Sequence, residues 1–133
     1  MASDISLEGC RIILVEDDDD TREVFDLGLR TYGATVFATA TAQVALLELQ
    51  RSPPDILVLD ISMPEVGGNE LLQAVRALRP KRGWDTPAIA VTAYNEPEQR
   101  MKTLDAGFRH HLPKPINIAY LAAVIRDVAR QPR

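Results

Sequence analysis

The sequence predicts an α/β fold in which a five-stranded parallel sheet carries helices on both faces. Two observations predict it. Short apolar runs rich in Ile, Leu and Val recur along the chain, and the segments between them carry apolar residues at helical spacing. Strands that alternate with helices in this way pair in parallel, and right-handed crossovers make all of them point in the same direction.

Five apolar runs are expected to form the strands. Two of them are almost continuously Ile, Leu and Val, which is typical of strands buried on both faces. The fifth run has the weakest pattern. The expected strands cover residues 12–15, 34–38, 56–59, 88–91 and 108–112.

Four of the intervening segments carry apolar stripes that indicate helices with one covered face. The stripes are Val24, Leu27, Gly28 and Tyr32; Ala42, Ala45, Leu46 and Leu49; Leu71, Ala74, Val75 and Leu78; and Leu121, Val124, Ile125 and Val128. Boundary residues agree with these helices. Gly33 is expected to end the first helix, Thr41 and Asn117 to cap two others, and Asn95-Glu96-Pro97 to begin a further one.

The overall composition is that of one ordinary globular domain of 133 residues, expected over residues 10–133 after a flexible leader of residues 1–9. A formal net charge of −4 argues against direct binding to nucleic acid or to anionic membranes, which require a basic surface. Cys10 is the only cysteine, so an internal disulfide is excluded and a cytoplasmic location is favoured. The longest apolar runs are too short to cross a bilayer.

Polar residues follow the predicted strands at the point where each strand ends. Glu16-Asp17-Asp18 follow the first strand, Asp60 the third, Thr92 the fourth and Lys114-Pro115 the fifth. In an open parallel sheet, ligands bind outside the carboxyl ends of the strands. The sequence therefore predicts that carboxylates, a hydroxyl and an amine meet at one edge of the sheet.

The expected chemistry of this edge follows from its charge. Carboxylates ~4 Å apart repel each other by roughly 4 kcal/mol at an effective dielectric constant of 20. Such a cluster needs a cation or stays partly protonated. Hard oxygen ligands on an open site suit Mg²⁺, which also shares phosphate oxygens. The sequence thus predicts a magnesium site that can accept a phosphoryl group.

Together, the residues at this edge closely resemble those of response regulator receiver domains. The resemblance rests on Glu16-Asp17, Asp60-Ile-Ser-Met-Pro64, Val91-Thr92-Ala93 and Lys114-Pro115, and it extends over residues 11–129. It implies a doubly wound, flavodoxin-like sheet with strand order 2-1-3-4-5. It also implies a signalling protein of a two-component or phosphorelay system, which catalyses only its own phosphorylation and dephosphorylation.

The resemblance assigns roles to individual residues. Asp60 would accept a phosphoryl group from a phosphohistidine on a histidine kinase or a histidine phosphotransfer protein. Mg²⁺ would be held by Asp17, by Asp60 and by the backbone carbonyl of Ser62, with Glu16 contributing through water. Such a cluster would work by in-line positioning and charge neutralisation, as phosphoryl transfer generally requires.

Three further residues receive roles from the same resemblance. Thr92 would hydrogen-bond a phosphoryl oxygen, and Lys114 would pair with the phosphoryl charge and precede a cis peptide bond to Pro115. His111 occupies a switch position that is usually aromatic in the family, and it would move with Thr92 to regulate an unidentified protein target. The sequence does not decide whether the chain is a stand-alone regulator or the receiver domain of a hybrid sensor histidine kinase.

Alternatives remain at this stage. The chain could be a degenerate receiver that acts as an interaction module without phosphorylation. It could also be a magnesium-dependent phosphatase with an aspartyl-phosphate intermediate, although Ser62 stands where that class needs a second acid. Within the acidic run, Asp19 and Asp20 are expected to begin and cap the first helix, and the role of Asp18 is undecided.

Overall fold

The computed structural model describes residues 5–61, 68–93 and 96–132 of the chain. Within these ranges, five strands and five helices alternate. The strands are β1 (Arg11–Val15), β2 (Thr35–Thr39), β3 (Ile56–Leu59), β4 (Ala88–Thr92) and β5 (His110–Pro113). The helices are α1 (Asp19–Thr31), α2 (Ala42–Arg51), α3 (Gly68–Arg76), α4 (Pro97–Asp105) and α5 (Ile118–Arg130).

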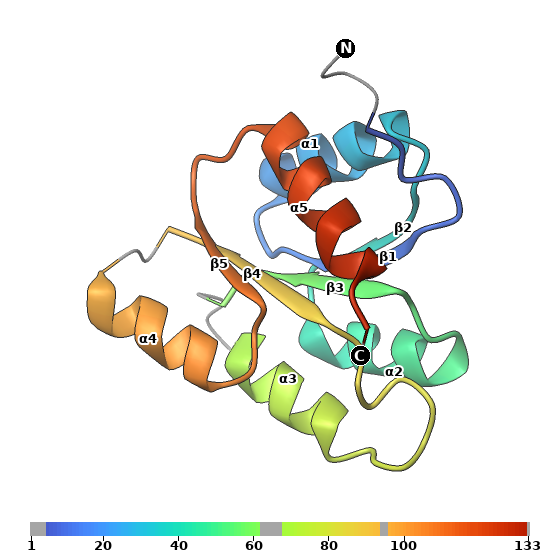
Figure 1. Cartoon of the computed structure of the whole chain (residues 1–133), viewed down its shortest axis with the longest axis vertical. Coiled ribbons are helices and arrows are strands. Elements are labelled where there is room, and N and C mark those ends of the chain that lie inside the picture. The colour runs from blue at the N-terminus through green and yellow to red at the C-terminus, as the bar shows by residue number, and fades with distance from the viewer. Residues whose placement is uncertain (1–4, 62–67, 94–95, 133) are drawn as a thin grey trace.

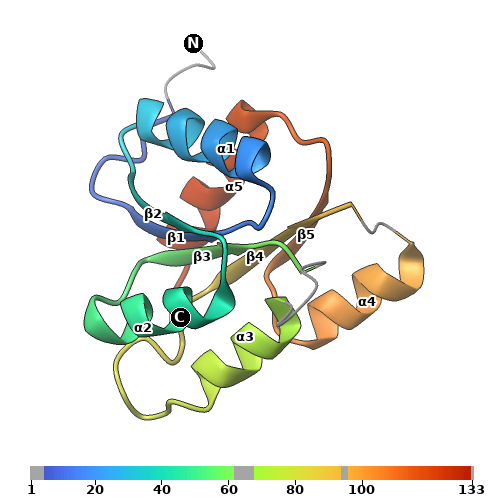
Figure 2. The same cartoon turned by 180° about the vertical axis from the view of Figure 1, so that it is seen from behind.

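The strands form one parallel sheet in the order β2-β1-β3-β4-β5. Helices α1 and α5 cover one face, while α2, α3 and α4 lie on the other (Figures 1 and 2). The predicted fold class and strand order are therefore confirmed. None of the helices in the described ranges has both the length and the apolar character needed to cross a membrane.

The core is divided between the two faces of the sheet because successive strand residues point in opposite directions. Ile12 and Leu14 of β1 pack with residues of α1 and α5. Ile13 and Val15 of the same strand pack with residues of α2 and α3. Burying one such side chain contributes roughly 1.5–3 kcal/mol, so a strand that is apolar at every position stabilises both layers.

The strand register brings the carboxyl ends of the strands to a common edge. Val15, the last residue of β1, is paired with Thr39 of β2 and with Leu59 of β3. Thr92, the last residue of β4, is paired with Pro113 of β5. The residues that follow β1, β3 and β5 therefore all leave the sheet at the same edge.

The covered face of α1 differs from the one predicted. Val24 and Leu27 are 60% and 59% exposed, whereas Phe25 and Leu29 are buried. Gly28 of the same stripe does approach α5 closely, since a Cβ atom at this position would lie 2.5 Å from Cγ1 of Ile118. The predicted stripe is therefore wrong for Val24 and Leu27, because apolar spacing alone does not fix which side packs.

The predicted flexible leader is wrong for the part of it that the structure describes, residues 5–9. The side chain of Leu7 is only 2% exposed and belongs to the core that α1 and α5 cover. The backbone N–H of Leu7 donates to the carbonyl oxygen of Tyr32 at 2.7 Å. This segment is ordered because it buries one apolar side chain and satisfies backbone groups at the end of α1.

The helix boundaries agree with the sequence at most positions. Thr41 and Asn117 cap α2 and α5 by accepting hydrogen bonds from backbone N–H groups, and Gly33 follows α1 with φ +103°. α4 begins at Pro97, but its N-cap residue Glu96 makes no side-chain capping hydrogen bond. Asn95, which was expected to help begin this helix, lies outside the described residues.

Candidate functional site

The residues at the carboxyl edge are positioned by backbone hydrogen bonds that continue the sheet one step beyond its strands. The N–H of Glu16 donates to the carbonyl oxygen of Thr39 at 3.0 Å, and the N–H of Asp60 donates to that of Val15 at 2.9 Å. The N–H of Lys114 donates to the carbonyl oxygen of Thr92 at 2.8 Å. Each residue is thus tied to the neighbouring strand.

Three carboxylates meet at this edge. Glu16, Asp17 and Asp60 each offer a ligand oxygen, and these oxygens all lie within 4.8 Å of one another. The side chains of Glu16 and Asp60 are only 2% and 4% exposed, whereas Asp17 is exposed. The cluster therefore has a buried floor formed by two acids and an open side at the third.

Lys114 provides a cation inside this cluster. Its Nζ donates to Oε1 of Glu16 at 2.6 Å and to Oδ2 of Asp60 at 3.4 Å. One ammonium group thus faces three carboxylates, which leaves the cluster with excess negative charge. No sequence pattern indicated that Glu16 would be the nearer partner of Lys114, because the two residues are 98 positions apart.

The pKa values at the site are shifted by burial and by these contacts. Burial raises the pKa of Glu16, and the nearby charge of Asp60 raises it further, against the opposing hydrogen bond from Lys114. Burial by itself would lower the pKa of Lys114, but its hydrogen bond to Glu16 and the charge of Asp60 outweigh burial and raise that pKa. The contacts of Lys114 therefore favour its protonated form, while burial disfavours the ionised form of Glu16.

Asp18 belongs to helix α1 rather than to the carboxylate cluster. Its Oδ2 accepts hydrogen bonds from the backbone N–H of Thr21 at 2.8 Å and from the hydroxyl of Thr21 at 2.6 Å. These bonds lower the pKa of Asp18. Asp19 begins the helix as predicted, but the cap is Asp18 and not Asp19 or Asp20.

Thr92 and His111 lie on neighbouring strands of the sheet. Thr92 ends β4 with a fully buried side chain and is joined to Lys114 through the backbone hydrogen bond. His111 is 3% exposed and pairs with Ala90 across β4 and β5. The predicted cis peptide bond between Lys114 and Pro115 is confirmed. Ser62, the predicted carbonyl ligand, lies outside the described residues.

The donor set fits a magnesium ion. Mg²⁺ prefers oxygen ligands, binds proteins through one or two carboxylates and keeps several waters. Asp17 and Asp60 offer carboxylate oxygens beside the open side of the cluster, and Glu16 adds a third carboxylate within the same 4.8 Å. A divalent cation would also offset the negative charge that Lys114 leaves uncompensated.

Comparison with known sequences gives consistent matches. The sequence model of the response regulator receiver domain matches residues 12–126. The chain is 42% identical over 116 residues to an uncharacterized 14.6 kDa protein of Leptolyngbya boryana, covering 87% of each chain. It is 36% identical over 121 residues to the response regulator MprA of Mycobacterium leprae, covering 91% of this chain and 51% of MprA. The chain thus spans about half the length of such regulators.

Solved structures agree with the sequence matches. The chemotaxis protein CheY4 of Vibrio cholerae superposes with a TM-score of 0.82 at 26% identity, covering 90% of this chain and 98% of that one. The receiver domain of the sensor histidine kinase PA1611 of Pseudomonas aeruginosa gives 0.82 at 27% identity, covering 92% and 99%. The PA1611 structure is described with a magnesium ion coordinated in its active-site cleft.

Proposed function

This chain belongs to the response regulator receiver domain family, and we propose that it works as a phosphoacceptor whose Asp60 takes a phosphoryl group from a phosphohistidine. The donor would be a histidine kinase or a histidine phosphotransfer protein. One observation carries the proposal: the buried carboxylate of Asp60 lies beside Asp17 and Glu16, with the ammonium of Lys114 at 3.4 Å. A cytoplasmic location is part of the same proposal.

The transfer needs a nucleophile and compensation of charge. An oxygen of the Asp60 carboxylate would form a bond to phosphorus while the phosphorus–nitrogen bond breaks, and the electron pair of that bond would stay on the imidazole. Mg²⁺ held by Asp17, Asp60 and the Ser62 carbonyl, with Glu16 acting through water, would supply positive charge to the phosphoryl oxygens. The protein's own contribution is the fixed position of Asp60 at the end of β3.

Lys114 and Thr92 would hold the transferred group. The ammonium of Lys114 already contacts Asp60 and Glu16, so a phosphoryl group on Asp60 would draw it away from Glu16. The hydroxyl of Thr92, at the end of the adjacent strand β4, would donate a hydrogen bond to a phosphoryl oxygen. Displacement of Thr92 would then shift His111 in β5 and change the surface that a protein target binds.

The phosphoryl donor requires access to the cluster, and an apolar pocket of about 430 Å³ lies directly beside it. Val24 and Phe25 of α1 line this pocket together with Lys114, Pro115 and Ile116. Val24 and its neighbour Leu27 on α1 are mostly exposed to solvent. We place the docking surface for the donor protein here, because an exposed apolar surface next to the phosphoacceptor favours binding of a partner.

Phosphorylation with a small-molecule donor tests the assignment. Wild-type protein incubated with Mg²⁺ and acetyl phosphate or phosphoramidate should gain an acid-stable, base-labile label, measured by intact-protein mass and by phosphate-affinity electrophoresis. Asp60→Asn should remain unlabelled while its circular dichroism spectrum is unchanged. Asp20→Asn is the matched control, since Asp20 is an exposed acid in the first turn of α1, and it should be labelled normally.

Other outcomes would point elsewhere. A label retained by Asp60→Asn would refute Asp60 as the acceptor. A wild-type protein without any label would favour an interaction module that works without phosphorylation. Sustained turnover of a small phosphate ester would favour the phosphatase alternative.

A further inference from the structure

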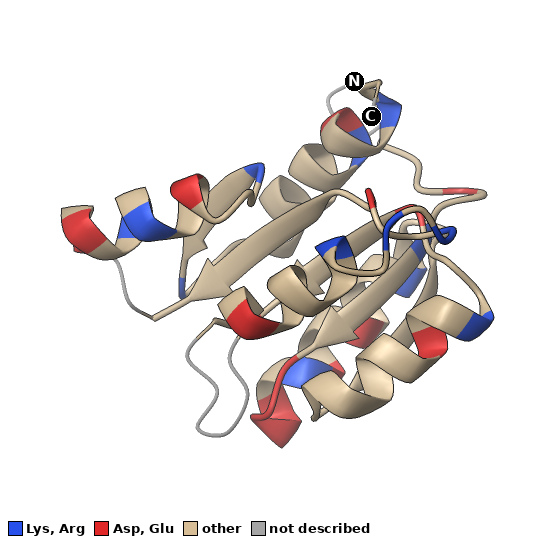
Figure 3. Cartoon of the chain, turned by 90° about the horizontal axis from the view of Figure 1, so that it is seen from below, with Lys and Arg blue, Asp and Glu red and all other residues tan. Residues whose placement is uncertain are grey.

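Asp17 is the exposed member of the carboxylate cluster, and its side chain is not tied to the rest of the protein. Within the described ranges, no hydrogen bond or ion pair involves its carboxylate. Figure 3 shows the acidic segment that contains Asp17 in red, at the end of the sheet toward which the strand arrows point. The position of this predicted metal ligand therefore depends on how the residues before and after it are fixed.

The residue after Asp17 is fixed to the first turn of α1. The carboxylate of Asp18 accepts hydrogen bonds from the backbone N–H and the hydroxyl of Thr21, at 2.8 and 2.6 Å. The backbone N–H of Asp18 donates to Oε2 of Glu16 at 3.1 Å. The chain that leaves Asp17 is thus anchored both to the helix and to the buried floor of the cluster.

The residue before Asp17 is fixed by the side chain of Arg22. Nη1 of Arg22 donates to the carbonyl oxygen of Glu16 at 2.9 Å. No backbone N–H in the described part of the chain donates to that oxygen. The carbonyl of Glu16 and the N–H of Asp17 belong to one planar peptide unit, so an anchor on the oxygen also orients the N–H. Arg22 therefore restrains the direction in which the chain enters Asp17.

The same guanidinium is also tied to α1. Helical side chains point back toward the N-terminus of their helix, which lets Arg22 reach the end of β1. Nη2 of Arg22 donates to Oδ1 of Asp19 at 2.7 Å, and the Arg22 side chain is only 23% exposed. A planar guanidinium presents its N–H donors in a rigid fork, so it can hold two separate acceptors at once. Arg22 thus links the start of α1 to the end of β1.

We propose that Arg22 is a positioning residue for the metal site. Its guanidinium fixes the peptide between Glu16 and Asp17 and so holds the Asp17 carboxylate ready for Mg²⁺. A ligand that is already ordered loses less conformational freedom on binding, and the affinity for the ion is higher. The inference rests on the proposed function, because it takes Asp17 as a ligand of the metal ion.

The charge of Arg22 acts in the opposite direction from its hydrogen bonds. A guanidinium beside the cluster repels a divalent cation, so loss of the charge alone should tighten binding of Mg²⁺. Loss of the anchor on Glu16 should weaken it. The sign of the change in affinity therefore separates a positioning role from a purely electrostatic one.

A metal titration measures this change directly. Mn²⁺ is the probe, because it takes the same oxygen ligands as Mg²⁺ and the free ion is counted by electron paramagnetic resonance. Mg²⁺ is then measured by competition. Arg22→Gln should weaken binding of both ions by about tenfold, the loss typical of residues that orient metal ligands. Arg22→Lys should weaken it at least as much, because an ammonium keeps the repulsive charge without the flat fork.

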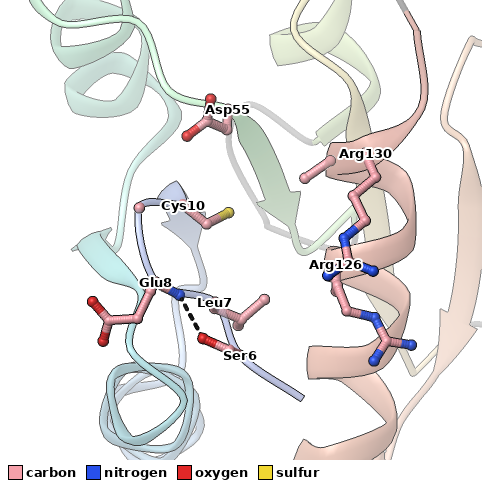
Figure 4. Close-up of a pocket in the computed structure, with 9 residues that line it drawn as sticks. Ser6, Leu7, Glu8, Cys10, Asp55, Arg126 and Arg130 are labelled. Carbon is pink, nitrogen blue, oxygen red and sulfur yellow. Dashed lines mark hydrogen bonds between the residues drawn. The ribbon is translucent and has the colours of Figure 1, made fainter. Parts of the chain in front are cut away.

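Two other arginines provide controls. Arg30 also donates to an acid of α1, Asp26, and to a strand carbonyl, that of Val36. Arg30→Gln therefore removes the same kind of link from the same helix, but away from Glu16. Arg126→Gln removes the same charge at the amino ends of the strands, beside the pocket in Figure 4. Both control variants should bind Mn²⁺ and Mg²⁺ as the wild type does.

Phosphorylation by acetyl phosphate at increasing Mg²⁺ gives a second readout. Arg22→Gln should need about tenfold more Mg²⁺ than the wild type for half-maximal labelling. Its labelling rate at saturating Mg²⁺ should equal that of the wild type, because Asp60 is held by its own hydrogen bond to Val15. A variant with a generally loosened fold would instead lose rate at every Mg²⁺ concentration.

The possible failures can be told apart. Unchanged or tighter metal binding by Arg22→Gln, beside normal binding by the wild type, would overturn the positioning role and leave the proposed phosphoacceptor intact. Equal weakening in Arg30→Gln would also overturn it, because the effect would then come from a loosened α1. A wild-type protein that binds neither ion would refute the metal site itself, and the positioning role with it.

Discussion

Two buried glutamates lie at opposite ends of the sheet, and they differ in how their charge is compensated. Glu48, near the end of α2, is 8% exposed. Its carboxylate accepts hydrogen bonds from Arg51 through both oxygens, at 2.8 and 2.9 Å, and Nη2 of Arg11 lies 3.7 Å away. Two guanidinium groups thus neutralise one carboxylate, and no further cation is needed.

Glu16, at the other end, is buried to a similar degree but shares its single ammonium partner. Lys114 contacts both Glu16 and Asp60, and Asp17 adds a third carboxylate to the cluster. The guanidinium of Arg22 lies near Glu16 but donates to its backbone carbonyl oxygen, at 2.9 Å, and to the carboxylate of Asp19. Burial of an acid is therefore not a sign of function on its own, whereas several carboxylates that share one cation indicate a site for a further cation.

Addition of magnesium should produce the largest difference in the free energy of unfolding between variants at the two ends of the sheet. At a concentration about 100 times its dissociation constant, Mg²⁺ should raise the free energy of unfolding of the wild type by ~2.7 kcal/mol. Asp17→Asn and Asp60→Asn should each lose most of this gain, because each removes a predicted ligand. Glu48→Gln should keep it. Urea unfolding with and without Mg²⁺ measures the effect, and an undiminished gain in Asp17→Asn would contradict the proposed site.

Removing one cation at each end should have unequal costs. Without Mg²⁺ at neutral pH, Lys114→Met should lower the free energy of unfolding by about 2 kcal/mol, since it leaves two buried carboxylates without their cation. Arg51→Met should cost less than about 0.5 kcal/mol, because Arg51 is 73% exposed and Arg11 remains near Glu48. Equal losses in denaturant unfolding would mean that the two ends do not differ in charge balance.

Removing one carboxylate at each end should have effects of opposite sign. Asp60→Asn should stabilise the metal-free protein by about 1 kcal/mol, because it relieves repulsion from Glu16 and Asp17. Glu48→Gln should destabilise it by about 1 kcal/mol, because two arginines lose their charged acceptor. Thermal unfolding of both variants in a chelating buffer distinguishes these outcomes. A destabilised Asp60→Asn protein would show that Lys114 already balances the cluster.

The pH dependence of stability should reveal Glu16 through a change in slope. Burial raises the pKa of Glu16 in the folded state above the unfolded value of 4.5, so the folded protein binds this proton more tightly. The resulting stability is fully present below pH 4.5 and is lost as the pH rises through the folded pKa. The wild type, without Mg²⁺, should therefore lose stability relative to Glu16→Gln as the pH rises above 4.5. Parallel pH profiles for the two proteins would contradict this.

Helix α1 shows where sequence reasoning fails. The spacing of Val24 and Leu27 predicted a covered face, but both side chains are mostly exposed, while Phe25 and Leu29 on the same helix are buried. The segment around Leu7 looked like a loose leader, yet one apolar side chain and a hydrogen bond to Tyr32 order it. Both errors have one cause, since the outcome depends on a neighbour that is distant in the sequence.

For the cluster around Asp60, the sequence predicted the positions of the residues along the chain, but it left their roles untested. The sequence predicted which residues follow each strand, but the roles of Asp17, Asp60, Thr92 and Lys114 in phosphoryl transfer remain predictions. The capping role of Asp18 was undecided at that level, because Asp18, Asp19 and Asp20 are chemically alike. The structure identifies Asp18 as the cap because its carboxylate accepts hydrogen bonds from the backbone N–H and the hydroxyl of Thr21.

The sequence alone was enough to predict the fold, because alternating apolar strands and amphipathic helices have few ways to bury both faces of a sheet. It also determined that Asp60 and Lys114 leave the sheet at one edge, since parallel strands end on the same side. The tertiary structure alone decided which acids are buried and that Lys114 lies nearest to Glu16. Such pairings depend on distances of a few ångströms between residues far apart in the chain, and no local pattern encodes them.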